Sequence, residues 1–140
     1  KIKSFFFVYS SMFEGKPDYL EIYRYFRMNY FKNIDEFYQN FYQNLGQDLN
    51  KFFEEKSEII MQKKIKHPVY SIEDIKFRLV RDFFLNQSQY DEIMISMIKE
   101  KKFNFFNFYK KLFFQKDDLK NLDKLGHLVG IHSHNHPTLL

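Results

Sequence analysis

The stretch from Gly126 to Pro137 has the sequence GHLVGIHSHNHP, in which a short apolar run comes directly before a dense histidine cluster. Four of the five histidines of the chain fall within ten residues here, and the chain has no cysteine. Continuous apolar runs such as Leu128 to Ile131 are typical of buried strands. Imidazole is the commonest metal-binding side chain. The stretch therefore predicts a strand followed by a candidate metal-binding site.

A second apolar run, Phe5 to Tyr9, lies near the other end of the chain and predicts a buried strand of a parallel sheet. Between the two runs, apolar residues recur at steps of three and four, which is the spacing of one helix face. Because parallel strands need a crossover connection, this order predicts a βαβ unit with a large helical segment inside it. The predicted helices cover Asp18–Tyr30, Ile34–Phe53, Ile72–Leu85, Tyr90–Ile98, Phe103–Phe114 and Lys116–Leu125.

Polar residues and glycine mark the ends of several predicted helices. Asn33 is a predicted N-cap, and Glu36 stands at the position that a capping box requires. Ser71 and Ser88 are predicted to cap the two helices that follow. Gly126 is predicted to end the last helix at its C′ position, where glycine is strongly preferred.

The composition limits the classes of function. No apolar run approaches the ~20 residues that span a membrane, so we expect no transmembrane segment. The absence of cysteine excludes disulfides and thiolate zinc sites. The net charge is only +4, and basic and acidic residues are interleaved, so we expect no nucleic-acid partner. The expected location is cytoplasmic. The charged stretch from Lys56 to Tyr70 contains Pro68 and predicts a linker with a possible short helix.

The spacing of the histidines decides how they can share a metal. In a straight strand His132 and His136 would stand about 13 Å apart, because a strand rises ~3.3 Å per residue. Zinc–nitrogen bonds are about 2.0–2.1 Å long, so one ion could not reach both side chains. Pro137 disfavours the helical region for His136. The strand is therefore predicted to end near His132, with the chain curling back as a loop.

The pattern Gly126-His127-x-x-Gly130-x-His132-Ser133-x-x-His136-Pro137 resembles the second signature motif of the polysaccharide deacetylases, the NodB-homology carbohydrate esterases. The helix Asp117 to Leu125 matches the helix that usually precedes this motif. The run Phe5 to Val8 resembles the second barrel strand of that family. The resemblance covers the two ends of the chain.

The resemblance implies an α/β fold, a partial (β/α) barrel of NodB type that carries a large all-helical insertion. Residues 1–12 would form a barrel strand and loop, 13–115 the helical insertion, and 116–140 the helix, strand and metal-binding loop. It implies hydrolysis of N- or O-acetyl groups on a bacterial glycan or sugar precursor. The resemblance implies that His132 and His136 are ligands of a divalent metal, which we expect to be zinc. Ser133 matches a position that shapes the loop, and His134 is expected to face solvent or substrate.

The chain departs from the family pattern at several points. Leu128 stands where the family usually has an acidic residue. The family's first motif, Thr-Phe-Asp-Asp, supplies a third metal ligand and the base, and it is absent from these 140 residues. We expect it upstream of Lys1, with further barrel strands beyond Leu140, so that the chain is a fragment and inactive alone. The alternative is a non-catalytic helical interaction module with a degenerate histidine motif.

Overall fold

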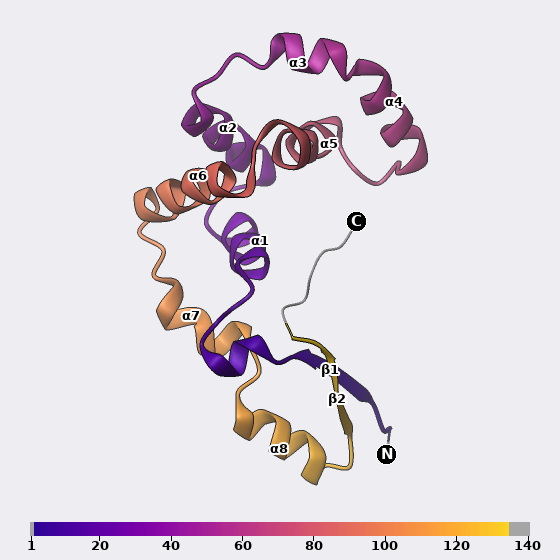
Figure 1. The fold of residues 1–140 in the computed structure, drawn as a ribbon, viewed down its shortest axis with the longest axis vertical. Coiled ribbons are helices and arrows are strands. Elements are labelled where there is room, and N and C mark those ends of the chain that lie inside the picture. The colour runs from indigo at the N-terminus through magenta and orange to yellow at the C-terminus, as the bar shows by residue number, and fades with distance from the viewer. Residues whose placement is uncertain (1, 135–140) are drawn as a thin grey trace. The chain divides into compact units, whose positions relative to one another are not determined.

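The computed structural model describes residues 2–134, which are 65% helical (Figure 1). Two compact units are present: a strand unit, formed by the described parts of Lys1–Tyr25 and Asn104–Leu140, and a helical unit, Phe26–Phe103. No helix of the described part is long and apolar enough to cross a bilayer. The elements in chain order are β1 (Phe5–Tyr9), the 3₁₀ turn η1 (Ser11–Glu14), α1 (Tyr19–Asn29), α2 (Ile34–Leu45), α3 (Asn50–Glu55), α4 (Ser57–Lys66), α5 (Ile72–Leu79), the π-helical turn η2 (Val80–Phe84), α6 (Gln87–Glu100), α7 (Phe105–Leu112), α8 (Lys116–Lys124) and β2 (Leu128–Ser133).

The predicted α/β barrel is wrong. The described residues form a single sheet of two strands, β1 and β2, and all other long segments are helical. The sequence offers only two apolar runs outside the helical spacing, whereas a (β/α) barrel is closed by eight parallel strands. The resemblance to a barrel family rests on the two ends of the chain and carries no information about the residues between them.

The pairing of the two predicted strands is confirmed. β1 and β2 are neighbours and run parallel, with Phe5 opposite Leu128 and Val8 opposite Ile131. The helix α8 precedes β2, and the left-handed Gly126, at φ +83°, ends it as predicted. Around β1, Val8 is buried, and the Tyr9 ring meets the buried Phe113 edge-on at 6.2 Å. The sheet is therefore anchored by aromatic residues of the segment that leads into α8.

The core of the helical unit is a cluster of aromatic rings on α2, α5 and α6. The Phe77 ring lies 5.3 Å from Phe37 and 4.9 Å from Phe41, both nearly perpendicular to it. Tyr38 and Tyr90 contact the same ring. Perpendicular pairs are favourable because the positive edge of one ring meets the negative face of the other. The predicted apolar stripe of α2 is thus core.

Two predicted helices are interrupted. The segment Ile34–Phe53 is not one helix, because Gly46 adopts φ +64° and its N–H bonds to the carbonyl of Tyr42, which ends α2. The segment Ile72–Leu85 changes to a π-turn after Leu79, where the N–H of Leu85 bonds to the carbonyl of Val80. A regular helix over the predicted range would place Phe83 on the same face as Ile75 and Leu79, which are buried. Within the wider turn Phe83 is instead 68% exposed.

The helix caps follow the sequence with one shift. The side chains of Asn33 and Ser71 accept hydrogen bonds from the first turns of α2 and α5, as predicted. Glu36 does not complete a capping box at Asn33, because its carboxylate accepts from the N–H of Lys32 and from Lys101 Nζ. The cap of α6 is Asn86 and not Ser88. The predicted linker Lys56 to Tyr70 contains a full helix, α4, whose Ile60 packs with Ile75 and Leu79.

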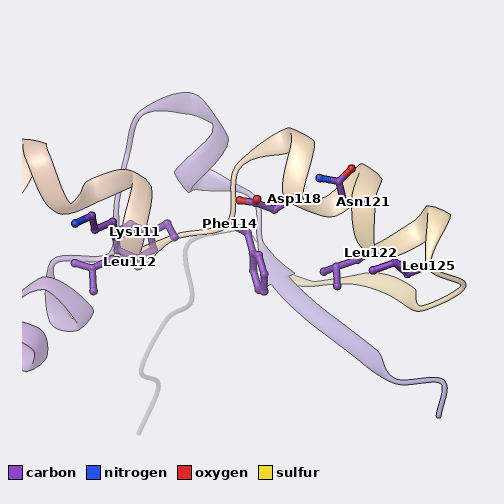
Figure 2. Close-up of a pocket in the computed structure, with 8 residues that line it drawn as sticks. Lys111, Leu112, Phe114, Asp118, Asn121, Leu122 and Leu125 are labelled. Atoms are coloured by element: carbon purple, nitrogen blue, oxygen red, sulfur yellow. The ribbon is translucent and has the colours of Figure 1, made fainter. Parts of the chain in front are cut away.

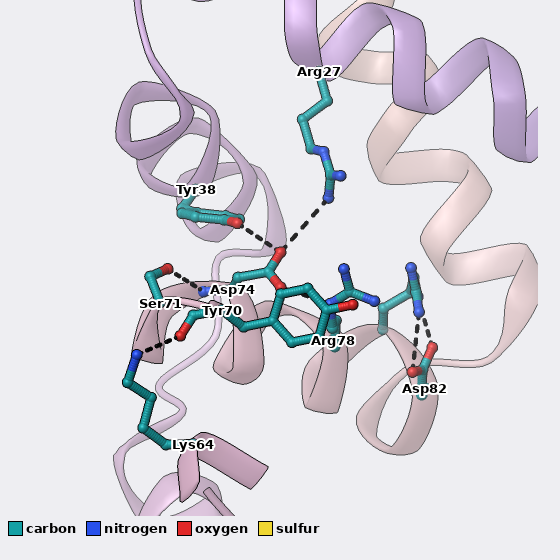
Figure 3. A network of polar contacts seen from close by, with 9 residues as sticks. Arg27, Tyr38, Lys64, Tyr70, Ser71, Asp74, Arg78 and Asp82 are labelled. Carbon is teal, nitrogen blue, oxygen red and sulfur yellow. Dashed lines mark hydrogen bonds and ion pairs between the residues drawn. The ribbon is translucent and has the colours of Figure 1, made fainter. Parts of the chain in front are cut away.

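A polar network joins three helices of the helical unit beside the aromatic cluster (Figure 3). Asp74 of α5 accepts a hydrogen bond from Tyr38 Oη at 2.9 Å and another from Arg78 Nε at 2.7 Å. Arg27 of α1 lies 4.0 Å from the same carboxylate. Burial, together with the hydrogen bond to Asp74, raises the pKa of Tyr38. One carboxylate thus holds two guanidinium groups and a phenol in place.

Replacing Phe77 by Ala should lower the free energy of unfolding by about 3–5 kcal/mol, because the ring is almost fully buried. Phe83→Ala is the matched control, since the same side chain six residues later is exposed; its effect should stay within about 0.5 kcal/mol. Urea unfolding followed by circular dichroism measures both variants. Equal losses for the two would contradict the observed position of the π-turn.

The helical unit should lose stability at alkaline pH. Burial raises the pKa of Tyr90 from 10.0 to about 12, so the folded protein keeps this phenol neutral while the unfolded chain ionises it. The contribution is complete below pH 10 and is lost as the pH rises toward 12, by about 2–3 kcal/mol in all. Urea unfolding at a series of pH values should show the decline. A decline of the same size in Tyr90→Phe would show that Tyr90 is not its source.

Candidate functional site

His132 lies at a β-bulge at the carboxyl end of β2. The register passes from Val8 opposite Ile131 to Tyr9 opposite Ser133, so that β2 has one residue more than β1 across this step, and that residue is His132. Bulges of this kind re-aim side chains and are common beside active sites. The His132 side chain is exposed. β2 ends at Ser133, one residue after His132, in agreement with the prediction that the strand ends near His132.

Backbone hydrogen bonds between the two segments continue beyond the end of β1. The N–H of Ser10 donates to the carbonyl of Ser133 at 3.0 Å, and the N–H of Ser11 donates to the carbonyl of His134 at 2.9 Å. Ser11 is buried, and the η1 turn begins at the same residue. These bonds fix the backbone of the histidine loop as far as His134.

The side chains at this edge form a short polar chain. Ser10 Oγ and His134 Nδ1 are hydrogen-bonded at 2.9 Å, and His134 Nε2 lies 3.9 Å from Glu14 Oε2. Glu14 also pairs with Lys16 at 3.6 Å. All of these groups are substantially exposed, so water screens the charges and the pairs add little stability. Their role is to orient the His134 ring toward η1.

His127 belongs to the opposite end of the sheet. Its Nδ1 accepts a hydrogen bond from the N–H of Ser4 at 3.2 Å, and its ring meets the Phe6 ring edge-on. The next residue continues the pairing, since the N–H of Leu128 donates to the carbonyl of Ser4. His127 is thus a structural residue at the entry to β2, separated from the other histidines by the length of the strand.

The assigned metal ligands are described in part. His132 is placed at the bulge, Ser133 is half-buried at the end of β2, and His134 contacts Ser10 and Glu14. His136 lies outside the described residues. Within residues 2–134 no three metal-ligating side chains come together. Of the described residues, His132 could supply one imidazole to a metal, and the other ligands would have to lie outside residues 2–134.

Ser10 and Glu14 belong to this site but were not predicted from the sequence. A signal for them was present, because Ser10 directly follows the predicted strand Phe5 to Tyr9. The carboxyl ends of parallel strands meet at one edge of a sheet, so residues after β1 are expected beside residues after β2. The pairing of Glu14 with His134 depends on the tight η1 turn, which has no clear sequence signal.

A cavity of the strand unit lies between the end of α7 and α8 (Figure 2). It has a volume of about 490 Å³ and is bounded by the end of α7 and by α8. Its walls are mainly apolar, including Phe114, Leu122 and Leu125. Its one acidic residue, Asp118, accepts a hydrogen bond from the N–H of Gln115 at the start of α8. Asp118 thus serves the start of α8, and we place the candidate site at the histidine loop.

Comparison of the chain with protein-family models, curated proteins and solved structures finds no match.

At neutral pH His127 should be found as the tautomer with the proton on Nε2, because Nδ1 accepts the N–H of Ser4. Long-range nitrogen–carbon correlation NMR distinguishes the two tautomers directly. A proton on Nδ1 would mean that the bond from Ser4 is absent in solution and that the entry to β2 is differently arranged.

Proposed function

We propose that this chain is part of a metal-dependent carbohydrate deacetylase, with His132 and His136 as two of the metal ligands. The substrate class is an N- or O-acetylated sugar or glycan. The proposal is supported by the motif from Gly126 to Pro137 and by the position of His132. It concerns the chemistry of the loop and does not require a barrel.

The observation that carries the proposal is the bulge at the end of β2. Ligand sites of parallel sheets lie beyond the carboxyl ends of the strands, and His132 is the residue that the bulge releases there. The backbone bonds from Ser10 and Ser11 then fix the loop up to His134. A metal ligand needs this support, because the groups around a ligand set its orientation and affinity.

A divalent metal bound there would polarise an acetyl carbonyl and activate water. Each residue of the histidine loop named here has a distinct role in this arrangement. His132 and His136 hold the metal through neutral imidazole nitrogens. Ser133 ends the strand, and its carbonyl ties the loop to Ser10. His134, oriented by Ser10, lines the substrate side. The remaining ligand and the general base would be the aspartates that the family resemblance implies.

Metal binding is the direct test on the chain itself. Titration with Co²⁺ or Zn²⁺ should show weak binding, because a catalytic zinc site normally has three protein ligands. His132→Ala and His136→Ala should each abolish it, whereas His134→Ala, the matched control between them, should retain it. Loss of binding in His134→Ala alone would show that His132 and His136 are not the pair that binds the metal.

The reaction is tested in a polypeptide that contains this sequence together with the aspartate motif. Acetate release from an acetylated chito-oligosaccharide should fall by at least about a hundredfold in His132→Ala, as for loss of other essential groups. The His134→Ala variant should retain most of the activity. Absence of both metal binding and acetate release would support the alternative, a non-catalytic helical interaction module.

A further inference from the structure

One face of the two-stranded sheet is apolar and open. The side chains of Phe5 and Phe7 share this face, because side chains alternate along a strand, and their ring centres are 6.1 Å apart in a stacked arrangement. Phe5 is 67% exposed and Phe7 is 64% exposed, whereas Val8, on the other face of β1, is buried. The Phe7 ring also lies so close to Gly130 of β2 that a Cβ there would come within 3.0 Å of it. Both rings therefore pack within the strand unit and still leave most of their surface in solvent.

The outer edge of β1 is open as well. Within residues 2–134 this strand pairs with β2 alone. The carbonyl of Ser4 and the N–H of Ser10 both bond to β2, and every second residue of a strand directs its backbone groups to the same neighbour. The even-numbered residues of β1 therefore face β2. The N–H and C=O groups of Phe5 and Phe7 consequently point to the edge away from β2.

The two edges of the sheet differ in their protection against a further strand. Natural sheets block an edge with charged residues, proline or a bulge. β2 has the bulge at His132, and Gly130 stands in its interior, where glycine weakens a strand. β1 has the sequence FFFVY, which contains none of these features and consists of residues with high strand propensity. A further strand is therefore expected to add at β1.

We propose that β1 pairs with β1 of a second copy of this chain, antiparallel and across a twofold axis at Phe7. The sequence FFFVY is complementary to itself about that point, since Phe7 faces Phe7, Phe5 faces Tyr9, and Phe6 faces Val8 of the second copy. Opposed aromatic and apolar side chains stabilise a strand pair, and no like charges meet. The outward N–H and C=O groups of Phe7 bond to the same groups of the second copy.

The pairing closes on itself. A twofold contact uses the same surface on both copies, so it ends at a dimer. The product is a four-stranded sheet with β2 on both outer edges, where the bulge opposes further addition. Four strands exceed the pair that is marginal alone. The interface involves one five-residue strand from each copy, and small interfaces belong to weak pairs, so we expect dissociation at micromolar concentrations.

Sedimentation equilibrium of the chain over the micromolar range measures the association. Phe7→Lys should weaken it by at least about tenfold, because like charges then face each other across the axis. Phe7→Glu should weaken it to a similar extent for the same reason. An equimolar mixture of the two variants should regain the association, since an ammonium then faces a carboxylate. This recovery is expected only if position 7 pairs with itself.

Ile131→Lys is the matched control, because it places the same charge on β2, at a side chain that is 74% exposed. It should associate like the parent chain, since β2 is the outer strand of the proposed sheet. Circular dichroism of all variants should match that of the parent. A chain that stays monomeric, a Phe7→Lys variant that associates like the parent, equal loss in Ile131→Lys, no recovery in the mixture, or growth beyond a dimer would each overturn the proposal.

Discussion

Parallel hydrogen bonding between β1 and β2 is the constraint on which the strand unit depends. The contacts run from Ser4 with His127 to Ser10 with His134, pairs that are 123 and 124 positions apart in the chain. The intervening residues therefore have to leave the sheet and return to it. The entropy cost of closing a loop grows only slowly with its length, so a segment as long as the helical unit is tolerated. The same pairing brings Ser10 and Glu14 to the histidine loop.

Packing in the helical unit accounts for part of the aromatic content of the chain. Rings on α2 and α6 surround Phe77 of α5, and the Arg27 guanidinium lies 5.7 Å from the centre of Phe77 and 5.9 Å from that of Phe37. Arg27 Nε is buried and has no hydrogen-bond partner within the described residues. An unsatisfied buried donor costs roughly 1–3 kcal/mol. The two ring contacts and the nearby Asp74 carboxylate offset part of that cost, which makes the cationic and aromatic parts of this core interdependent.

The histidine loop and the turn after α4 are held by different kinds of contact. At the histidine loop, backbone hydrogen bonds from Ser10 and Ser11 fix the chain as far as His134. After α4, the Lys64 ammonium donates to the carbonyls of Pro68 and Tyr70, and the Arg78 guanidinium lies over the Tyr70 ring.

The sequence by itself determined the local structure. Helix spacing, the caps at Asn33 and Ser71 and the stop at Gly126 are encoded within a few residues, because they depend on hydrogen bonds between near neighbours. The two strands are marked in the sequence by their apolar runs. The pairing of the two runs was also predictable, because the long helical segment between them is the crossover connection that two parallel strands require. Tertiary structure alone decided the π-turn that exposes Phe83, the bulge at His132 and the contact of Ser10 and Glu14 with His134. The bulge and the contacts of His134 depend on the register between distant segments, and register is set by packing energies that no local pattern contains.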